Sequence, residues 1–310
     1  MELYFLGTGA GMPSKQRNVT SIALNLLDER GTYWLFDCGE GTQHQIMHSP
    51  VKLGRTEILF VTHLHGDHLY GLPGLLTSRS YVGGDTPLKM FGPKGLKRFV
   101  ETALEVSGAH LGYTLTIEEL DEEGVIFEDD KFIVETARLE HRIECFGYRI
   151  TEKDLPGKLM MDKLKELGVP AGPLYGKLKQ GEQVELPDGR KLDGQDFVGA
   201  PLPGRVVVIL GDTRYCEGAK RLARGADVLV HEATFSQAKQ DLAYAFDHAT
   251  SIDAARVAEE AGAKSLIMTH LSSRYQGDDV EELLLEAKAI HGDSYIAKDL
   301  WSFEIHRKMS

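Results

Sequence analysis

The chain has 310 residues, of which 42% are hydrophobic, and this length suits either one large α/β domain with an insertion or two domains. The formal net charge is 35 − 47 = −12, which excludes a generally basic nucleic-acid-binding surface but leaves room for a local basic patch. Three cysteines without a CxxC pair, a start unlike a signal peptide and the lack of a long apolar run favour a cytoplasmic protein that does not enter a membrane.

The first half of the chain predicts a series of short strands separated by glycine-rich or polar turns. Apolar segments bounded by turn residues predict strands at 2–6, 21–27, 32–36, 57–61, 88–91, 115–120 and 131–139. Helices are expected at 72–81 and 95–106, the second closed by Gly108. Residues 13–18 form a polar loop with two cations and no acid, which we expect to be exposed.

Residues 151–203 differ in composition from the segments around them. Six of the eleven prolines lie here, and we expect a single short helix, at 159–167. The stretch from 170 to 181 carries two lysines and a tyrosine but no acid. We therefore expect an insertion that protrudes from a catalytic core, rather than a second domain.

In the second half, apolar strands repeatedly end at an acid or a histidine. Strands are expected at 206–210, 226–230 and 265–268, and amphipathic helices at 218–224, 251–261 and 279–290. Five strand ends in the whole chain carry such a side chain, namely Asp37, His63, Asp212, His231 and His270. Because strand ends gather side chains on one rim of a sheet, this pattern predicts a shared site.

The densest group of candidate ligands is His63-Leu64-His65-Gly66-Asp67-His68, directly after the strand at 57–61. Imidazole and carboxylate groups suit zinc, manganese or iron(II), and Gly66 lets the backbone turn tightly between them. A polar loop that is rich in histidine by chance is the alternative, which the strand-end residues elsewhere in the chain disfavour.

The number of candidate ligands matches a two-metal centre. Two zinc ions with open catalytic positions need about six or seven protein ligands. One ion is assigned to His63, His65 and His141, and the other to Asp67, His68 and His270. Asp212 is the expected bridge, since a carboxylate can contact two cations, and the nucleophile would be a metal-bound hydroxide. Asp67, if it faces that water, can also accept its proton.

Two further histidines, His231 and His248, lie in polar turns, and their roles stay open. A helix-capping or supporting role is as consistent with the residues as a catalytic one. An acid beside a histidine could also form the proton donor for a leaving oxygen, and Glu232 provides such an acid.

These motifs resemble the metallo-β-lactamase superfamily over almost the whole chain and, within it, the ribonuclease Z family of tRNA 3′-processing endoribonucleases. The narrower resemblance rests on matches to the family's N-terminal loop, its HEAT and HST motifs, the tip of its flexible arm and its bacterial C-terminal motif. The matching segments are Pro13–Asn18, His231–Thr234, His248–Thr250, Gly172-Pro173 with Lys177-Leu178-Lys179, and Ser273–Tyr275. Ala249 replaces the serine of the HST motif.

The resemblance implies an α/β fold, the αβ/βα sandwich, formed by residues 1–310 as a single catalytic domain with 151–203 as an inserted flexible arm. It also implies two zinc ions per subunit, with manganese possible in their place, and a homodimer whose arm grips tRNA bound to the partner. Asp67 would act as general base, while Glu232 and His248 would protonate the leaving 3′ oxygen. Phosphate contacts are expected from Lys15, Arg17, Lys177, Lys179 and Arg274.

We therefore expect a zinc-dependent endoribonuclease that removes the 3′ trailer of precursor tRNA. It would cut after the discriminator base, leaving a 3′-hydroxyl on the tRNA and a 5′-phosphate on the trailer. One alternative on the same fold is a hydrolase of small phosphodiesters or esters. Another is an RNA-binding protein with structural metals, which the scarcity of cysteine disfavours.

Overall fold

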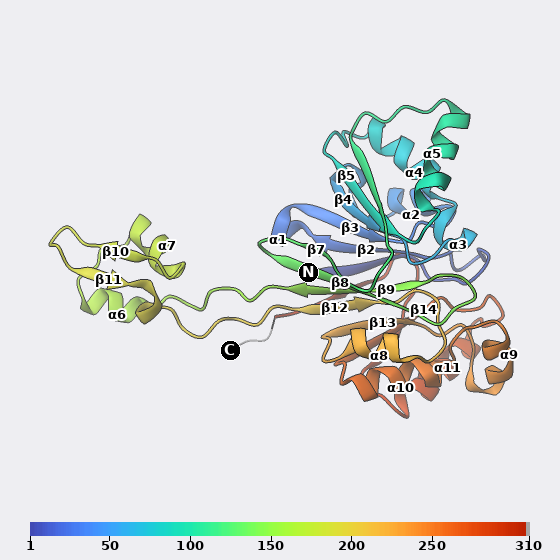
Figure 1. Ribbon diagram of the computed structural model, residues 1–310. Helices are drawn as coiled ribbons and strands as arrows, with labels where there is room; N and C mark the ends of the chain where they lie inside the picture. Colours follow the sequence, from blue (N-terminus) through green and yellow to red (C-terminus); the bar gives the residue numbers. More distant parts are fainter. Residues whose placement is uncertain (308–310) are drawn as a thin grey trace. The chain divides into compact units, whose positions relative to one another are not determined.

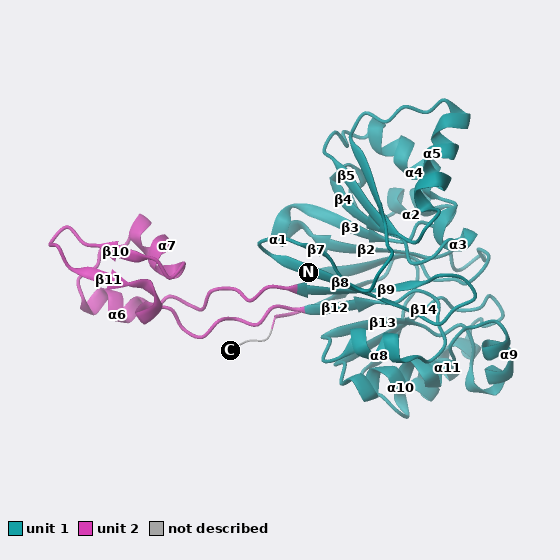
Figure 2. Cartoon of the chain, viewed as in Figure 1, with its two compact units in different colours: residues 1–151, 206–305 teal, residues 152–205, 306–310 magenta. Residues whose placement is uncertain are grey.

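The computed structural model describes residues 1–307, which divide into two compact units (Figure 2). The larger unit comprises residues 1–151 and 206–305, and the smaller comprises 152–205 with 306–307. Among the described residues, no helix is both long and apolar enough to span a bilayer.

Two seven-stranded sheets form the centre of the larger unit. The first has the order β16 (Ser302–Glu304), β1 (Glu2–Gly7), β2 (Ser21–Leu26), β3 (Thr32–Phe36), β4 (Thr56–Phe60), β5 (Leu88–Gly92) and β6 (Leu115–Glu119). The second has the order β15 (Ser294–Ile296), β14 (Ser265–Thr269), β13 (Val228–Glu232), β12 (Val206–Ile209), β9 (Phe146–Glu152), β8 (Phe132–Arg138) and β7 (Gly124–Glu128). In each sheet, four neighbouring strands are parallel, β3 to β6 in the first and β12 to β15 in the second.

Helices cover the outer face of each sheet, which gives four layers (Figure 1). On the first sheet these are α2 (Thr42–Met47), α4 (Leu72–Tyr81) and α5 (Leu96–Ser107), and on the second α8 (Glu217–Ala223), α10 (Ser251–Ala261) and α11 (Asp278–Lys288). Three short helices lie in connections: α1 (Leu27–Arg30), α3 (Gly66–Leu69) and α9 (Gln240–Ala245).

The main core lies between the two sheets and is rich in aromatic residues. Phe36, Phe60 and Phe91 come from the neighbouring strands β3, β4 and β5, and each is at most 1% exposed. Their rings stack in sequence, with centroids 4.9 and 5.5 Å apart. This packing orders the parallel strands whose carboxyl ends carry the candidate ligands.

The smaller unit has its own apolar cluster. It contains α6 (Met161–Glu166), α7 (Pro173–Lys179) and the hairpin β10 (Gln183–Glu185) with β11 (Lys191–Asp193). Leu164 and Leu178 are fully buried within it and hold α6 and α7 in place.

Most of the expected elements are found within a residue or two of their predicted bounds. The strands β7, β9, β15 and β16, the helix α7 and the β10–β11 hairpin were not predicted, nor were the short helices α2, α3 and α9. The connection between β2 and β3 contains the one-turn helix α1. Residues 152–205 form a compact unit of their own, and the role of residues 151–203 as an inserted arm stays a prediction.

Candidate metal centre

The candidate ligands gather where strands of both sheets end. His63 follows β4 of the first sheet, while Asp212 and His270 follow β12 and β14 of the second. His141 lies in the connection from β8 to β9. Side chains from remote parts of the sequence therefore meet at one edge of the larger unit, as the strand-end pattern predicts.

The first cluster contains His63, His65, His141 and Asp212. His65 Nδ1 lies 3.1 Å from His63 Nε2 and 3.2 Å from His141 Nε2. Asp212 Oδ2 lies 3.7 Å from His63 Nε2 and 4.0 Å from His141 Nε2. Ligands around a tetrahedral zinc ion, with bonds of about 2.0–2.1 Å, stand roughly 3.3–3.4 Å apart, so these ring nitrogens fit a common cation.

The second cluster contains Asp67, His68 and His270. His270 Nε2 lies 3.2 Å from Asp67 Oδ2 and 3.3 Å from His68 Nε2. Asp212 reaches this cluster too, with Oδ1 3.5 Å from His68 Nε2 and Oδ2 3.3 Å from His270 Nε2. Asp212 is thus the one carboxylate that borders both clusters, and the two together suit divalent metal binding.

Neighbouring groups engage the second ring nitrogen of four of these histidines. Such contacts orient the imidazole and select its tautomer. The pairs are His68 Nδ1 with Asp37 Oδ2 (2.7 Å), His63 Nδ1 with Thr62 Oγ1 (3.0 Å), His270 Nδ1 with Thr234 Oγ1 (2.9 Å) and His141 Nδ1 with the Asp247 carbonyl (2.9 Å). The Nε2 atoms of these four rings consequently point toward the shared centre.

The electrostatics favour ionised carboxylates at this centre. Burial alone would raise the pKa of the Asp212 carboxyl, but His270, His68 and His63 outweigh it and hold that pKa well below its ordinary value. Burial would also raise the pKa of the Asp67 carboxyl, but His270 and His68 outweigh this effect and lower that pKa. These are the protonation states that metal ligation requires.

The buried histidines respond in opposite directions. Burial and the adjacent imidazoles lower the pKa of His63, so that this ring is neutral. Burial would lower the pKa of His68 as well, but Asp212 and Asp37 raise it well above its ordinary value. Binding of a cation by His68 would therefore release a proton.

Beside the clusters, Glu232 and His248 form an ion pair. Glu232, the last residue of β13, is 1% exposed and lies 2.8 Å from His248 Nδ1 through Oε1. Its carboxylate also accepts hydrogen bonds from the backbone N–H groups of Thr213 (2.8 Å) and Ala249 (3.1 Å). Burial would lower the pKa of His248, but Glu232 outweighs it and raises that pKa to about 9, so the imidazole carries a proton at neutral pH.

Neither His231 nor His248 caps a helix, which was one of the roles left open by the sequence. Thr250 caps α10, and its side chain and that of Asp253 form a reciprocal capping box. His231 is fully buried and its Nδ1 lies 2.7 Å from the Glu232 carbonyl, away from both clusters. His248 is the histidine of this pair that lies beside the centre, with Nδ1 3.8 Å from Asp212 Oδ2.

The expected phosphate-contacting residues differ in their surroundings. Lys15 and Arg274 are exposed, and the Arg274 guanidinium lies over the Phe235 ring at 5.3 Å. Arg17 instead turns inward and donates hydrogen bonds to the Ala297 carbonyl (2.7 Å) and to Thr8 Oγ1 (2.6 Å). Lys177 and Lys179 belong to the smaller unit, where both are exposed on α7. The substrate contacts of all five residues stay predictions.

Several positions that support the centre were not among the predicted ligands or catalytic residues. Asp37 was noted as a strand-end acid, and Thr234 belongs to the HEAT segment, so both carried a signal. Gly11 donates its N–H to Asp67 Oδ2 at 2.7 Å, and Asp247 contributes only a carbonyl to His141. Backbone contacts of this kind leave no trace in residue type.

A hollow of about 280 Å³ opens directly onto the clusters. Its walls carry His65, Asp67, His141, His248 and His270. This volume lies near the lower end of ligand pockets, roughly 300–1,000 Å³, so it suits one end of a chain rather than a folded macromolecule.

Comparison with known proteins identifies the family. A family model described as "Anti-Pycsar protein Apyc1" matches residues 1–144. Proteins named ribonuclease Z from Bacillus cereus (strain B4264) and Bacillus thuringiensis (strain Al Hakam) are 59% and 60% identical over 307 residues, covering 99% of this chain and all of theirs. The chain belongs to the ribonuclease Z family. The resemblance drawn from the sequence motifs is thereby confirmed.

Solved structures confirm the predicted fold. The short form of human tRNase Z matches with a TM-score of 0.72 and 31% identity, covering 99% of this chain and all of that one. The metallo-β-lactamase fold protein YhfI from Bacillus subtilis matches with a TM-score of 0.67 at 18% identity, covering 97% of this chain and 98% of that one. The larger unit therefore has the metallo-β-lactamase fold. Membership of the ribonuclease Z family disfavours the small-substrate alternative.

Proposed function

We propose that the chain removes the 3′ trailer of precursor tRNA by cutting after the discriminator base. The chain is a metal-dependent endoribonuclease of tRNA 3′ processing, as its full-length similarity to ribonuclease Z proteins supports. The observation that carries the cut itself is the pairing of a two-cluster metal centre with a protonated His248 at one hollow. We place the reaction in the cytoplasm.

We assign two Zn²⁺ ions to each subunit, with Mn²⁺ able to replace them. His63, His65 and His141 would hold the first ion, Asp67, His68 and His270 would hold the second, and Asp212 would be shared by both. The spacing of the ligand atoms supports this assignment, and so does an all-imidazole and carboxylate donor set. When bound, such ions polarise the phosphoryl oxygens and lower the pKa of water to near neutrality.

The protein's own groups then handle two protons. Asp67 accepts a proton from the attacking water as its oxygen forms a bond to phosphorus. Because Nδ1 of His248 is engaged by Glu232, its Nε2–H is the group that donates to the leaving 3′ oxygen as the P–O3′ bond breaks. The products are a 3′-hydroxyl on the tRNA and a 5′-phosphate on the trailer.

The decisive experiment incubates the purified protein with a precursor tRNA that carries a 3′ trailer, in the presence of Zn²⁺ or Mn²⁺. We expect one cut after the discriminator nucleotide, with a ligatable 3′-hydroxyl and a trailer that a 5′-phosphate-dependent exonuclease degrades. Asp67→Asn should abolish cutting, whereas Asp85→Asn, at an exposed carboxylate, should not. The proposal would be refuted if the precursor stayed uncut with Zn²⁺ and also with Mn²⁺. Metal analysis of the purified protein should find two ions per chain.

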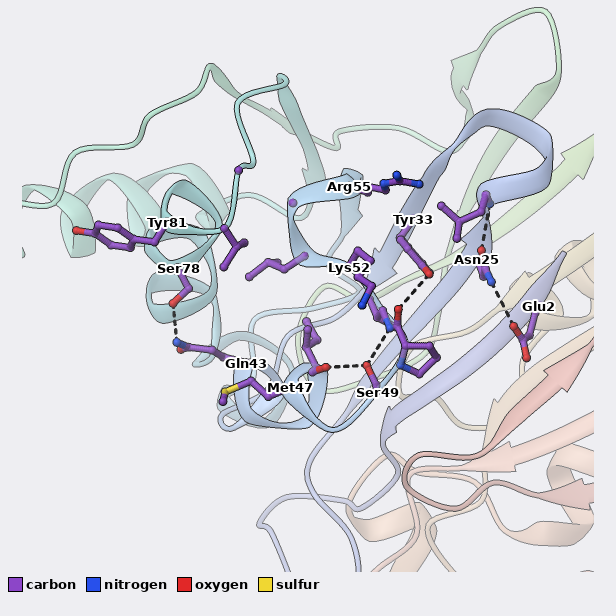
Figure 3. A pocket seen from close by; sticks show the side chains of 18 residues that line it. Glu2, Asn25, Tyr33, Gln43, Met47, Ser49, Lys52, Arg55, Ser78 and Tyr81 are labelled. Carbon is purple, nitrogen blue, oxygen red and sulfur yellow. Dashed lines mark hydrogen bonds between the residues drawn. The ribbon is translucent and has the colours of Figure 1, made fainter.

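We further propose that the protein acts as a homodimer and that α2 and α4 form part of the contact. Met47 on α2, Tyr81 on α4 and Val82 directly after α4 are 76%, 89% and 57% exposed, which is unusual for apolar side chains grouped at one hollow. The hollow they help to line measures about 1050 Å³ (Figure 3). A hydrogen bond between Gln43 and Ser78, which both line this hollow, links the two helices.

A further inference from the structure

An aromatic side chain stands exposed at the rim of the reaction hollow. Phe246 follows α9, is 44% exposed and lines the same hollow as Asp67 and His248. The other phenylalanine in that lining, Phe235, is 5% exposed and packs inside. A single exposed phenylalanine is ordinary on a protein surface, so its surroundings have to decide whether it has a function.

Phe246 is backed by a guanidinium group. Arg142 Cζ lies 4.8 Å from the ring centroid, and its Nη2 donates a hydrogen bond of 2.5 Å to the Ala245 carbonyl. Its Nε also lies 3.5 Å from Asp247 Oδ2. One face of the ring is thus covered by a fixed cation, which leaves the opposite face for a ligand.

The segment that presents the ring is held on several sides. Asp247 adopts a left-handed backbone with φ of 58°, and Arg214 pairs with its carboxylate. The Asp247 carbonyl lies 2.9 Å from His141, and the next residue, His248, pairs with Glu232. A non-glycine residue in this conformation is strained and persists only where its surroundings require it. The position of the Phe246 ring is therefore coupled to two residues of the reaction centre.

Resting on the proposed function, we propose that Phe246, backed by Arg142, is a stacking platform for the discriminator base. Single-stranded RNA ends are bound by stacking of unpaired bases on aromatic rings and guanidinium planes. Phe246 lies two residues from His248, which serves the leaving 3′ oxygen, and that oxygen belongs to the discriminator nucleotide. The ring consequently contacts the base on the tRNA side of the cut rather than the first trailer base.

The test combines protein variants with precursors that lack single bases. Wild type, Phe246→Ala and Phe246→Trp are assayed on an intact precursor, on one abasic at the discriminator and on one abasic at the first trailer nucleotide. Tyr244→Ala serves as the matched control, because Tyr244 is a 37% exposed aromatic residue of α9 that is not among the residues lining the hollow. Melting temperatures confirm that each variant is folded.

We expect Phe246→Ala to lower kcat/KM on the intact precursor by roughly ten- to a hundredfold, as removal of a base-stacking ring typically does. Phe246→Trp should restore most of the activity, since the indole offers a comparable face. On the precursor without the discriminator base, wild type and Phe246→Ala should be equal. If Phe246→Ala lowered kcat/KM equally on all three precursors, stacking on this ring would be excluded. If the effect of Phe246→Ala disappeared only on the precursor that lacks the first trailer base, the ring would contact the trailer base and not the discriminator base. Wild-type cutting of the intact precursor tests the proposed function independently.

Discussion

Neutralising the two lysines of α7 should weaken tRNA binding in a way that depends on salt. Lys177 and Lys179 are both exposed, and among the described residues no carboxylate is paired with either ammonium group. Each phosphate contact contributes roughly −0.7 to −0.9 to the slope of log binding constant against log salt concentration. If both lysines contact phosphate, the variant Lys177→Ala with Lys179→Ala should lose about 1.6 of that slope.

This slope can be converted into a measurable difference. Between about 50 and about 200 mM salt, the wild type's advantage should shrink by roughly tenfold, because ~1.6 multiplied by the logarithm of four is about one. Filter binding or fluorescence anisotropy with precursor tRNA over this range gives the two slopes. Turnover of a small phosphodiester such as bis(4-nitrophenyl) phosphate should be unchanged, since its cleavage needs only the metal centre.

A second variant removes the same charge from the same unit without touching α7. Lys165 and Lys191 already pair with carboxylates of Asp162 and Glu185, at 3.5 and 4.0 Å. Replacing both by alanine should leave the salt slope close to that of the wild type. The reasoning would be refuted if the α7 variant and the wild type had the same slope of log binding constant against log salt concentration. It would also be refuted if the α7 variant lost as much activity on the small phosphodiester as on precursor tRNA.

Three further predictions concern stability and assembly. Burial would raise the pKa of Glu57 and Asp129, but Arg30 outweighs this effect and lowers both pKa values. Because the ionised carboxylates are favoured in the folded state, the Arg30 contacts stabilise the fold above about pH 4, and this contribution is lost as the pH falls further. Urea unfolding of Arg30→Ala should thus show a loss of about 1–2 kcal/mol at neutral pH that shrinks near pH 3, and a pH-independent loss would contradict this. Removal of bound metal by a chelator should lower the melting temperature. Zinc added at about a hundred times its Kd should restore about 2.7 kcal/mol of the free energy of unfolding. An unchanged melting temperature on adding zinc would argue against binding to the folded state. Tyr81→Glu should yield monomers in light scattering at unchanged helix content, while an intact dimer would exclude the α2–α4 surface.

Sequence reasoning predicted the fold class correctly and named candidate ligands that lie close together in the structure, but it missed several individual elements. The seven candidate ligands lie in segments that follow apolar strands, where an ionisable side chain is conspicuous, and the structure brings all of them together. The strand β7 was missed because Val125 is exposed and acidic residues precede it, so the segment has no clear apolar alternation. The helix α7 begins at Pro173, a position that suits proline, but Gly176 in its interior disfavours helix, and the burial of Leu178 in the local cluster compensates.

What the sequence conveys least is how the parts of the centre are held in register. The cluster at 63–68 follows a strand of the first sheet, whereas Asp212 and His270 follow strands of the second, so each metal position depends on how the sheets pack. The end of β4 is tied across the interface, because the Tyr148 hydroxyl donates to the Val61 carbonyl at 2.6 Å and the Phe146 N–H donates to the Thr62 carbonyl at 2.9 Å. Both contacts lie within two residues of His63. The distances between ligands are therefore fixed by the close-packed core between the two sheets, in which small shifts cost free energy. A metal centre whose ligands come from two sheets requires this rigidity.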